Sequence, residues 1–326
     1  MKAIKFFAIS AMAAAMITSC SSEDELSQSN YPSDNIIRVT AGVNNAKTRA
    51  EGAGTEMKND FSLTIVNKNA PKYTYTDKVF SKKSGDWACS ETLLWQKSDA
   101  LVDIVAFAPA QTGKFNGVYA NGSIQPIAYS VAKDQTTADD KNDLLYYYAK
   151  DFNPGESLDK GKLKIQFNHA FCMIDINVTL GTEFNKPEVL KESPIVKVTL
   201  GGTKIAANVN VTNAASVVTI SETDAATDIT TTKGSFDKAA NAEANAKSCF
   251  SCIAIPQTVG ANTFKVSLMT AGKLYEWTSD KEITLQSGYR YTLNLSMGND
   301  VVLLKGGSIS ATPWTEITGD KPLETD

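Results

Sequence analysis

The chain has 326 residues, of which 42% are hydrophobic and 21% are charged, and its net charge is -4. This composition is typical of a globular protein with enough length for two cores, and the weak charge gives no electrostatic basis for a nucleic-acid partner. Valine, isoleucine, threonine and tyrosine recur between Asn-Gly, Gly-Gly and proline turns, with no long helical period after the N-terminal segment. The sequence therefore predicts an all-β fold with two cores.

The N-terminus has the pattern of an export signal. Lys2 and Lys5 precede an apolar stretch, residues 6–17, that is too short to remain as a membrane span. The sequence Ile-Thr-Ser-Cys that ends at Cys20 resembles a bacterial lipobox, which implies cleavage before Cys20 and acylation of that cysteine. We expect residues 1–19 to be a lipoprotein signal peptide and Cys20 to hold the chain in outer-membrane lipid. A secretory signal with an incidental cysteine is the alternative.

An acidic and serine-rich linker, residues 20–35, is expected next. Its acidic run at 21–25 resembles the signal that carries some lipoproteins of the Bacteroidetes type to the outer face of the outer membrane. A solvated linker without a message explains the same run equally well.

The first predicted strand leads directly into an exposed connection. Ile37, Val39 and Val43 alternate with polar or small residues, as in a strand that buries one face. Residues 44–54 are polar or small and contain two glycines, so they offer little to a core. We expect Arg49 to lie in a loop that a trypsin-like protease can cut.

Further strands follow along the chain. They are predicted at 61–66, 73–80, 101–109, 162–180, 196–202, 206–211, 249–256, 263–269, 273–277, 283–285 and 289–295. Within 162–180 the apolar residues change from odd to even positions at His169, which predicts a bulge there. Residues 221–246 predict a long variable loop. The residues expected in the cores include Ile37, Val39, Phe107, Ile165, Phe167, Ile174, Ile176, Ile255, Leu293 and Leu295.

Aromatic residues suggest one alternative function. Tyr146 and Tyr148 fall on the same face of a predicted strand, whereas Tyr147 points to the other face. Together with Trp277 they would suit a surface lipoprotein that acts as a monomer and binds glycan, provided that they are displayed to solvent.

No catalytic or metal-binding pattern is present. His169 is the only histidine and has no ligand-spaced neighbour, which favours packing or hydrogen bonding over catalysis. The cysteines Cys89, Cys172, Cys249 and Cys252 allow three complete disulfide pairings, and the sequence does not choose among them. Cys249 and Cys252 would point to opposite faces of a strand, which does not suit zinc. We expect no enzyme activity, no metal and no cofactor.

A series of short motifs, taken in order, resembles the fimbrillin family, the Mfa-like subunits of lipoprotein-derived pili in Bacteroidales. After the lipobox these motifs are Lys47-Thr48-Arg49-Ala50, Phe107-Ala108-Pro109, Asp134-Gln135, Asp143-Leu144-Leu145, Phe167-Asn168-His169-Ala170, Ile255-Pro256-Gln257-Thr258, Leu285 with Gly288, Tyr289 and Tyr291, and Pro313-Trp314. Each is weak alone, and their order extends over nearly the whole chain.

The resemblance implies two tandem transthyretin-like β-sandwich domains, 36–158 and 159–326. It also implies a surface pilus whose subunits polymerise by strand exchange and mediate adhesion, with a stalk position favoured over tip or anchor. An Arg-specific surface protease would cut between Arg49 and Ala50, with Lys47 and Arg38 as competing sites. The first strand, with Ile37, Val39 and Val43, would then leave its groove. The C-terminal strand of another pilin subunit would fill this groove with Val301, Val302, Leu303, Leu304 and Ile309.

Overall fold

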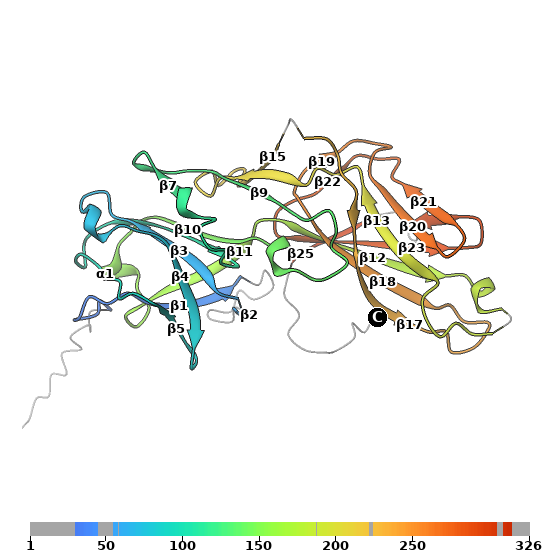
Figure 1. Ribbon diagram of the computed structural model, residues 1–326, viewed down its shortest axis with the longest axis horizontal. Coiled ribbons are helices and arrows are strands. Elements are labelled where there is room, and N and C mark those ends of the chain that lie inside the picture. The colour runs from blue at the N-terminus through green and yellow to red at the C-terminus, as the bar shows by residue number, and fades with distance from the viewer. Residues whose placement is uncertain are drawn as a thin grey trace, which may run out of the picture.

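The computed structural model describes residues 30–44, 55–57, 59–186, 188–221, 224–304 and 309–314. Strands make up most of its regular structure and form two lobes along an elongated molecule (Figure 1), which confirms the all-β class. The helical segments are single turns: η1 (Pro71–Tyr73), η2 (Asn116–Val118), η3 (Asp140–Asn142), α1 (Pro154–Ser157) and η4 (Thr182–Asn185). None of the described helices is long and apolar enough to cross a membrane.

The first lobe is built on one sheet. Its strands are β1 (Arg38–Val43), β2 (Thr55–Glu56), β3 (Phe61–Val66), β4 (Tyr75–Lys83), β5 (Asp86–Cys89), β6 (Val102–Ala108), β10 (Leu145–Phe152) and β11 (Lys162–His169). Seven of them close into a ring in the order β11-β10-β6-β3-β4-β5-β1, because β1 pairs with both β5 and β11, and β2 adds to β1. A ring of this kind is barrel-like, whereas the expected sandwich would have two separate sheets.

The second lobe contains several smaller sheets. The largest has β12 (Cys172–Leu180) at its centre, with β17 (Thr232–Asp237), β18 (Lys247–Ala254), β23 (Tyr289–Met297), β24 (Val302–Leu304) and β25 (Ser310–Pro313). A four-stranded sheet contains β13 (Ile195–Gly201), β16 (Ile229–Thr230), β20 (Lys265–Thr270) and β21 (Leu274–Thr278). In a three-stranded sheet β14 (Ala206–Val209) lies between β15 (Val218–Ile220) and β9 (Ile127–Ser130), and β19 (Thr258–Val259) pairs with β22 (Ile283–Thr284). Outside this lobe, β7 (Tyr119–Ala120) pairs with β8 (Ser123–Ile124) in the chain between β6 and β10.

The wall formed by β6 and β10 is shared by two hydrophobic cores. Ile104 of β6 belongs to the core of the ring, while its neighbour Val105 belongs to the core of the second lobe. In β10, Tyr147 packs on the ring core and Tyr146 and Tyr148 pack on the other, as the predicted alternation requires. Because both faces of β6 are covered, all of its residues are buried.

An excursion of the chain between β6 and β10 also joins the lobes. Its strand β9 pairs with β14 of the second lobe, and Gln135 lies buried beyond it. The side chain of Gln135 donates to the carbonyl of Ile253 at 2.9 Å and accepts from the amide of the same residue at 2.8 Å. The Asp134-Gln135 motif is therefore explained by a buried amide that satisfies the backbone of β18.

The segment 162–180 is two strands, and the predicted bulge is wrong. β11 ends at His169 in the ring, and β12 begins at Cys172 in the largest sheet of the second lobe. The parity of the apolar residues changes because the chain passes from one core to the other at Ala170 and Phe171, both fully buried. The sequence had assigned 159–169 to the second domain, but its strand β11 lies in the first sheet. The predicted long loop at 221–246 also needs correction, because it contains β16 and β17.

The predicted core residues are confirmed. All ten are at most 6% exposed: Ile37, Val39, Phe107, Ile165, Phe167, Ile174, Ile176, Ile255, Leu293 and Leu295. The alternation of apolar residues thus identified the inward faces even where the sheet arrangement differed from expectation.

Candidate strand-exchange site

β1 supplies most of the hydrogen-bonding ladder of β11. The two strands run parallel and pair over six residues, from Arg38 opposite Lys162 to Val43 opposite Phe167. On its other side β11 pairs with β10 at only two positions, both beyond the end of the β1 ladder. In the described sheet, withdrawal of β1 would therefore open the ring and leave most of residues 162–167 without a ladder partner.

The opposite edge of β1 meets only short segments. The amide of Ile37 donates to the carbonyl of Leu93 at 2.9 Å. Val39 lies opposite Trp87 of β5, and the last two residues of β1 pair with β2. One long ladder and three short contacts hold the strand, so β11 offers the continuous edge on which a replacement strand can form.

The inward side chains of β1, and of Ile37 just before it, are packed in the core of the ring. Ile37, Val39 and Val43 are 6%, 3% and 3% exposed and belong to the same cluster as Phe61 and Phe167. Burial of each such aliphatic side chain contributes about 1.5–3 kcal/mol relative to exposure. The predicted inward face of the first strand is confirmed, and a groove emptied of it would expose apolar surface.

Arg38 is the one proposed cleavage position among the described residues, and it lies in the sheet. Its backbone pairs with β11, so a protease reaches it only after local opening of the sheet. Its guanidinium lies 2.6 Å from Asp34, and the hydrogen bond it donates lowers the pKa of that carboxyl to about 2. Both side chains are 44% exposed, so the pair contributes little to stability.

Residues 45–54 join β1 to β2, which pair antiparallel. Lys47, Arg49 and Ala50 fall in this connection and lie outside the described residues, as does Cys20. Asn44 is the last described residue before the connection. Its amide donates to the carbonyl of Phe167 at 2.7 Å. A cut in 45–54 would therefore separate β1 from the rest of the ring.

The C-terminal segment lies along the edge of β23 that β12 leaves free. β24 pairs antiparallel with the end of β23, and β25 pairs with its beginning. Leu304 lies opposite Leu295 and Ser310 opposite Thr292, so the register shifts by three residues between them. The two short strands are two parts of one interrupted edge strand.

The predicted donor residues are only partly buried in this position. Val301 and Leu303 are 50% and 59% exposed, Val302 is buried, and Leu304 and Ile309 are half-buried against the core of the second lobe. All four residues of β25 are exposed. The segment is therefore held near its two ends, by Val302 and by the buried Trp314.

Trp314 reaches the join between the two lobes. Its indole stacks on the imidazole of His169, with ring centroids 3.8 Å apart and planes at 11°. His169 is buried, and its Nδ1 lies 3.0 Å from a carboxylate oxygen of Asp143. The predicted packing and hydrogen-bonding role of this histidine is confirmed. The sequence contained both motifs but gave no sign that they meet.

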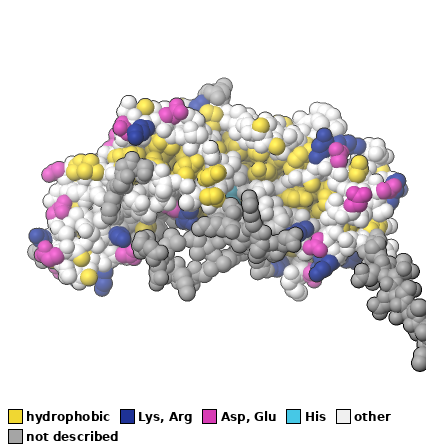
Figure 2. All heavy atoms as spheres, turned by 180° about the vertical axis from the view of Figure 1, so that it is seen from behind, with side chains coloured by type: hydrophobic (Ala, Val, Ile, Leu, Met, Phe, Trp, Pro, Cys, Tyr) yellow, Lys and Arg dark blue, Asp and Glu magenta, His cyan; other side chains and the backbone are white. Residues whose placement is uncertain are grey.

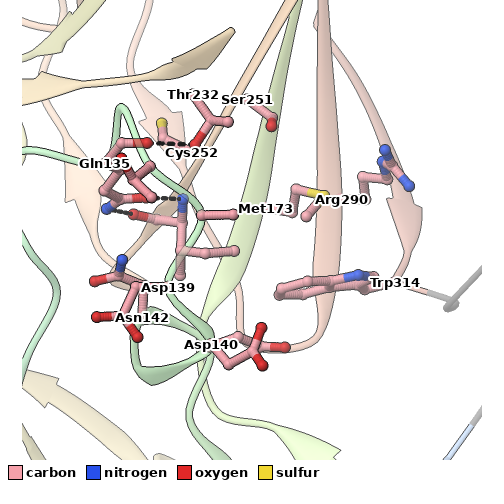
Figure 3. A pocket seen from close by; sticks show the side chains of 14 residues that line it. Gln135, Asp139, Asp140, Asn142, Met173, Thr232, Ser251, Cys252, Arg290 and Trp314 are labelled. Carbon is pink, nitrogen blue, oxygen red and sulfur yellow. Dashed lines mark hydrogen bonds between the residues drawn. The ribbon is translucent and has the colours of Figure 1, made fainter. Parts of the chain in front are cut away.

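A recess of about 440 Å³ opens beside Trp314. Figure 3 shows the indole between Met173 and Arg290 on one side and Asp140 on the other. The guanidinium of Arg290 is paired with Asp175 on the neighbouring strand. Arg290 and Trp314 are therefore both engaged in contacts within the protein, and the recess lies along the side of the docked C-terminal segment.

The four cysteines that the structure describes, Cys89, Cys172, Cys249 and Cys252, are unpaired. Cys172 and Cys252 are buried on adjacent strands, and burial raises the pKa of both thiols. Cys249 is half-buried on the opposite face of β18 from Cys252, as the strand period predicted. Among the described residues, no group of three or more His, Cys, Asp or Glu side chains is arranged to hold a metal ion.

The tyrosines and Trp277 do not form an open aromatic surface. Tyr146 and Tyr148 are half-buried against the second core, and Trp277 packs edge-on to Phe264 at 6.4 Å between ring centroids. In the described part of the chain, all the large exposed apolar side chains are aliphatic. The display that the glycan-binding alternative requires is therefore lacking at these three positions.

A family model described as "Fimbrillin-like" matches residues 48–314. The chain belongs to the fimbrillin-like family. The match begins just before Arg49 and ends at Trp314, so it starts within the connection after β1 and includes β24 and β25. No curated protein matches the chain.

Solved structures share the fimbrillin-like fold at low identity. A protein from Bacteroides ovatus, described provisionally as a cell adhesion protein, has a TM-score of 0.61 and 16% identity over 87% of this chain and 99% of its own. A similarly described protein from Bacteroides uniformis has a TM-score of 0.56 and 14% identity, over 87% of this chain and 100% of its own. The tip fimbrial protein Mfa3 from Porphyromonas gingivalis has a TM-score of 0.50 and 10% identity, over 86% of this chain and 99% of its own.

Proposed function

We propose that this fimbrillin-like chain is a structural subunit of a cell-surface pilus, assembled by protease-triggered β-strand exchange and active in adhesion. The observation that carries the proposal is the place of β1. This strand closes the ring, provides most of the ladder of β11, and is followed directly by the connection that contains Arg49. Its replacement by another strand would restore both the ladder and the buried face.

The intact connection keeps the subunit closed. While β1 remains attached, its local concentration at the groove far exceeds that of an incoming strand. A cut between Arg49 and Ala50 by an Arg-specific surface protease removes this advantage, and the C-terminal segment of another subunit then fills the groove. Lys47 is the competing cleavage position in the same connection.

Two features of the chain support a stalk position within this proposal. A stalk subunit must accept a strand and also donate one, and this chain has both a removable first strand and an apolar C-terminal edge segment. Hydrophobic side chains gathered over the middle of the face in Figure 2 suit a molecule that is covered by neighbours in a fibre. A tip subunit would need only the acceptor groove.

We further propose two domains that meet at Ala170 and Phe171, where the chain leaves the ring. Before processing, the precursor is held by lipid on Cys20 at the outer membrane and faces the exterior. Labelled palmitate should therefore be incorporated into the wild-type precursor and lost in Cys20→Ala. Label retained by the variant would contradict the lipid anchor.

The N-terminus of the mature protein tests the processing step. Protein collected from the cell surface should begin at Ala50. Arg49→Ala should keep its first strand, and the triple variant Arg38→Ala, Lys47→Ala, Arg49→Ala controls for cleavage at neighbouring positions. A mature surface protein that still begins at Cys20 would contradict protease-triggered exchange.

A further inference from the structure

The two segments that the proposed exchange would move both end at the last residues of β11. At the end of β1, the side-chain amide of Asn44 donates to the side-chain oxygen of Asn168 at 2.8 Å. At the end of the C-terminal segment, Trp314 stacks on His169. Asn168 and His169 are consecutive, although the two segments are separated by almost the whole chain.

A single cavity connects these contacts. It has a volume of about 380 Å³ and is lined by Asn44, Tyr146, Asn168, His169, Ser287, Gly288 and Trp314. The amide of Trp314 donates to the carbonyl of Gly288 at 2.7 Å, and the amide of Gly288 donates to that of Phe171 at 2.9 Å. Phe171, just after β11, therefore holds the C-terminal segment through Gly288. Phe167, two residues before His169, accepts the hydrogen bond from Asn44 at the end of β1.

His169 is fixed by the ring as well as by Trp314. It lies opposite Leu145 of β10, and Asp143 holds its Nδ1. Its Nε2 is buried without a hydrogen-bond partner among the described residues. The indole of Trp314 covers one face of the imidazole of His169. Departure of the indole would expose that face.

We propose that His169 is the positioning residue that keeps the C-terminal segment docked on its own subunit, and that it couples release of this segment to departure of β1. The inference rests on the proposed exchange function. When β1 leaves, Phe167 and Asn168 lose their hydrogen bonds with Asn44, and the next residue, His169, on which Trp314 stacks, is held less firmly. A subunit whose groove has opened can therefore also release its C-terminal segment and donate it to another subunit.

Such coupling is reciprocal. If loss of β1 weakens docking of Trp314, loss of the stack must weaken the end of β1 by the same factor. The C-terminal segment would then act as an autoinhibitory contact in the intact precursor, because a docked segment cannot enter the groove of a neighbour.

Hydrogen exchange in the uncleaved full-length protein tests the coupling without any assembly. Trp314→Ala should speed exchange of the amides of 310–312. It should also speed exchange of the amides of 42–44 about threefold to tenfold, which is the range expected for loss of one aromatic pair. Phe236→Ala is the matched control, since Phe236 is a half-buried aromatic residue on the same core but lies in β17, at the edge of the sheet opposite the C-terminal segment. It should leave 42–44 unchanged.

Two further variants keep the test decisive if Trp314→Ala does not fold. Trp314→Phe preserves a smaller ring, and His169→Phe preserves the stack but loses the bond to Asp143. Each should speed amide exchange in the same two segments as Trp314→Ala, but by a smaller factor. Faster exchange of the amides of 310–312 with unchanged exchange at 42–44 would overturn the coupling. Unchanged exchange at 310–312 would overturn the role of Trp314 in holding the C-terminal segment. Neither result depends on whether cleaved protein polymerises. Failure of the coupling is therefore distinguishable from failure of the proposed function.

Discussion

The first strand and the C-terminal segment are both extended pieces at the ends of the described chain, but they are held in opposite ways. β1 lies inside a closed ring, with Val39, Val43 and the preceding Ile37 buried. The C-terminal segment lies on an open sheet edge, and β25 buries none of its four residues. β1 therefore cannot leave without opening the ring, whereas the C-terminal segment can leave its sheet edge with the rest of the described sheet still paired. This difference explains why only the first would need a covalent trigger.

The largest effect should come from a charge placed in the inward face of β1. Val39→Asp puts an unpaired carboxylate in the ring core and should lower the free energy of unfolding by about 4 kcal/mol or more. Leu303→Asp, on the exposed part of the edge segment, should change it by less than about 0.5 kcal/mol. Urea unfolding of the two variants measures both. Equal losses would show that the two segments are held alike.

Two tryptophans sharpen the comparison. Trp95 is 2% exposed and packs in the ring core, so Trp95→Ala should cost about 3–5 kcal/mol. Trp314 is 6% exposed, yet Trp314→Ala should cost less than about 2 kcal/mol, because the edge segment can undock locally while the rest of the lobe stays folded. Global unfolding measured by ring-core fluorescence or circular dichroism distinguishes them. A loss at Trp314 as large as that at Trp95 would place the C-terminal segment in the cooperative core.

The smallest effect concerns the turn before β1. The pKa of Asp34 is lowered to about 2 by the hydrogen bond from Arg38. A lowered carboxyl pKa stabilises the fold above the unfolded value of about 3.9, and the contribution is lost as the pH falls toward 2. An NMR titration of the Asp34 carboxyl should give a midpoint near 2, and Arg38→Gln should move it toward about 3.9. A midpoint that does not respond to this variant would exclude the ion pair as the cause.

The sequence predicted which residues face inward but not which strands meet. Alternation placed Val39 and Phe167 in a core, and it separated Tyr147 from its two neighbours. The pairing of Asn44 with Asn168 joins positions 124 residues apart. No local pattern contains that information, so the closed ring was not expected. The change of parity at His169 was a true signal with the wrong explanation, because a bulge and a crossing between sheets produce the same pattern.

The short family motifs had a physical basis that the sequence alone did not reveal. Gln135 and Gln257 are buried amides that pair with backbone groups of distant segments. His169 and Trp314 belong to separate motifs that meet in one stack. Such polar and aromatic contacts depend on tertiary structure, so each motif looks weak until its partner is placed beside it.

The most direct test of the central claim, that β1 is the strand exchanged, is the size of the purified protein after treatment with a trypsin-like protease. The account predicts cleavage after Arg49, loss of the segment that contains β1, and growth of oligomers that resist dissociation. A truncation that lacks residues 301–326 should be cleaved but should not extend a polymer, because it accepts a strand without donating one. Protein that is fully cleaved at Arg49 yet stays monomeric, with no difference between the full chain and the truncation, would contradict the account.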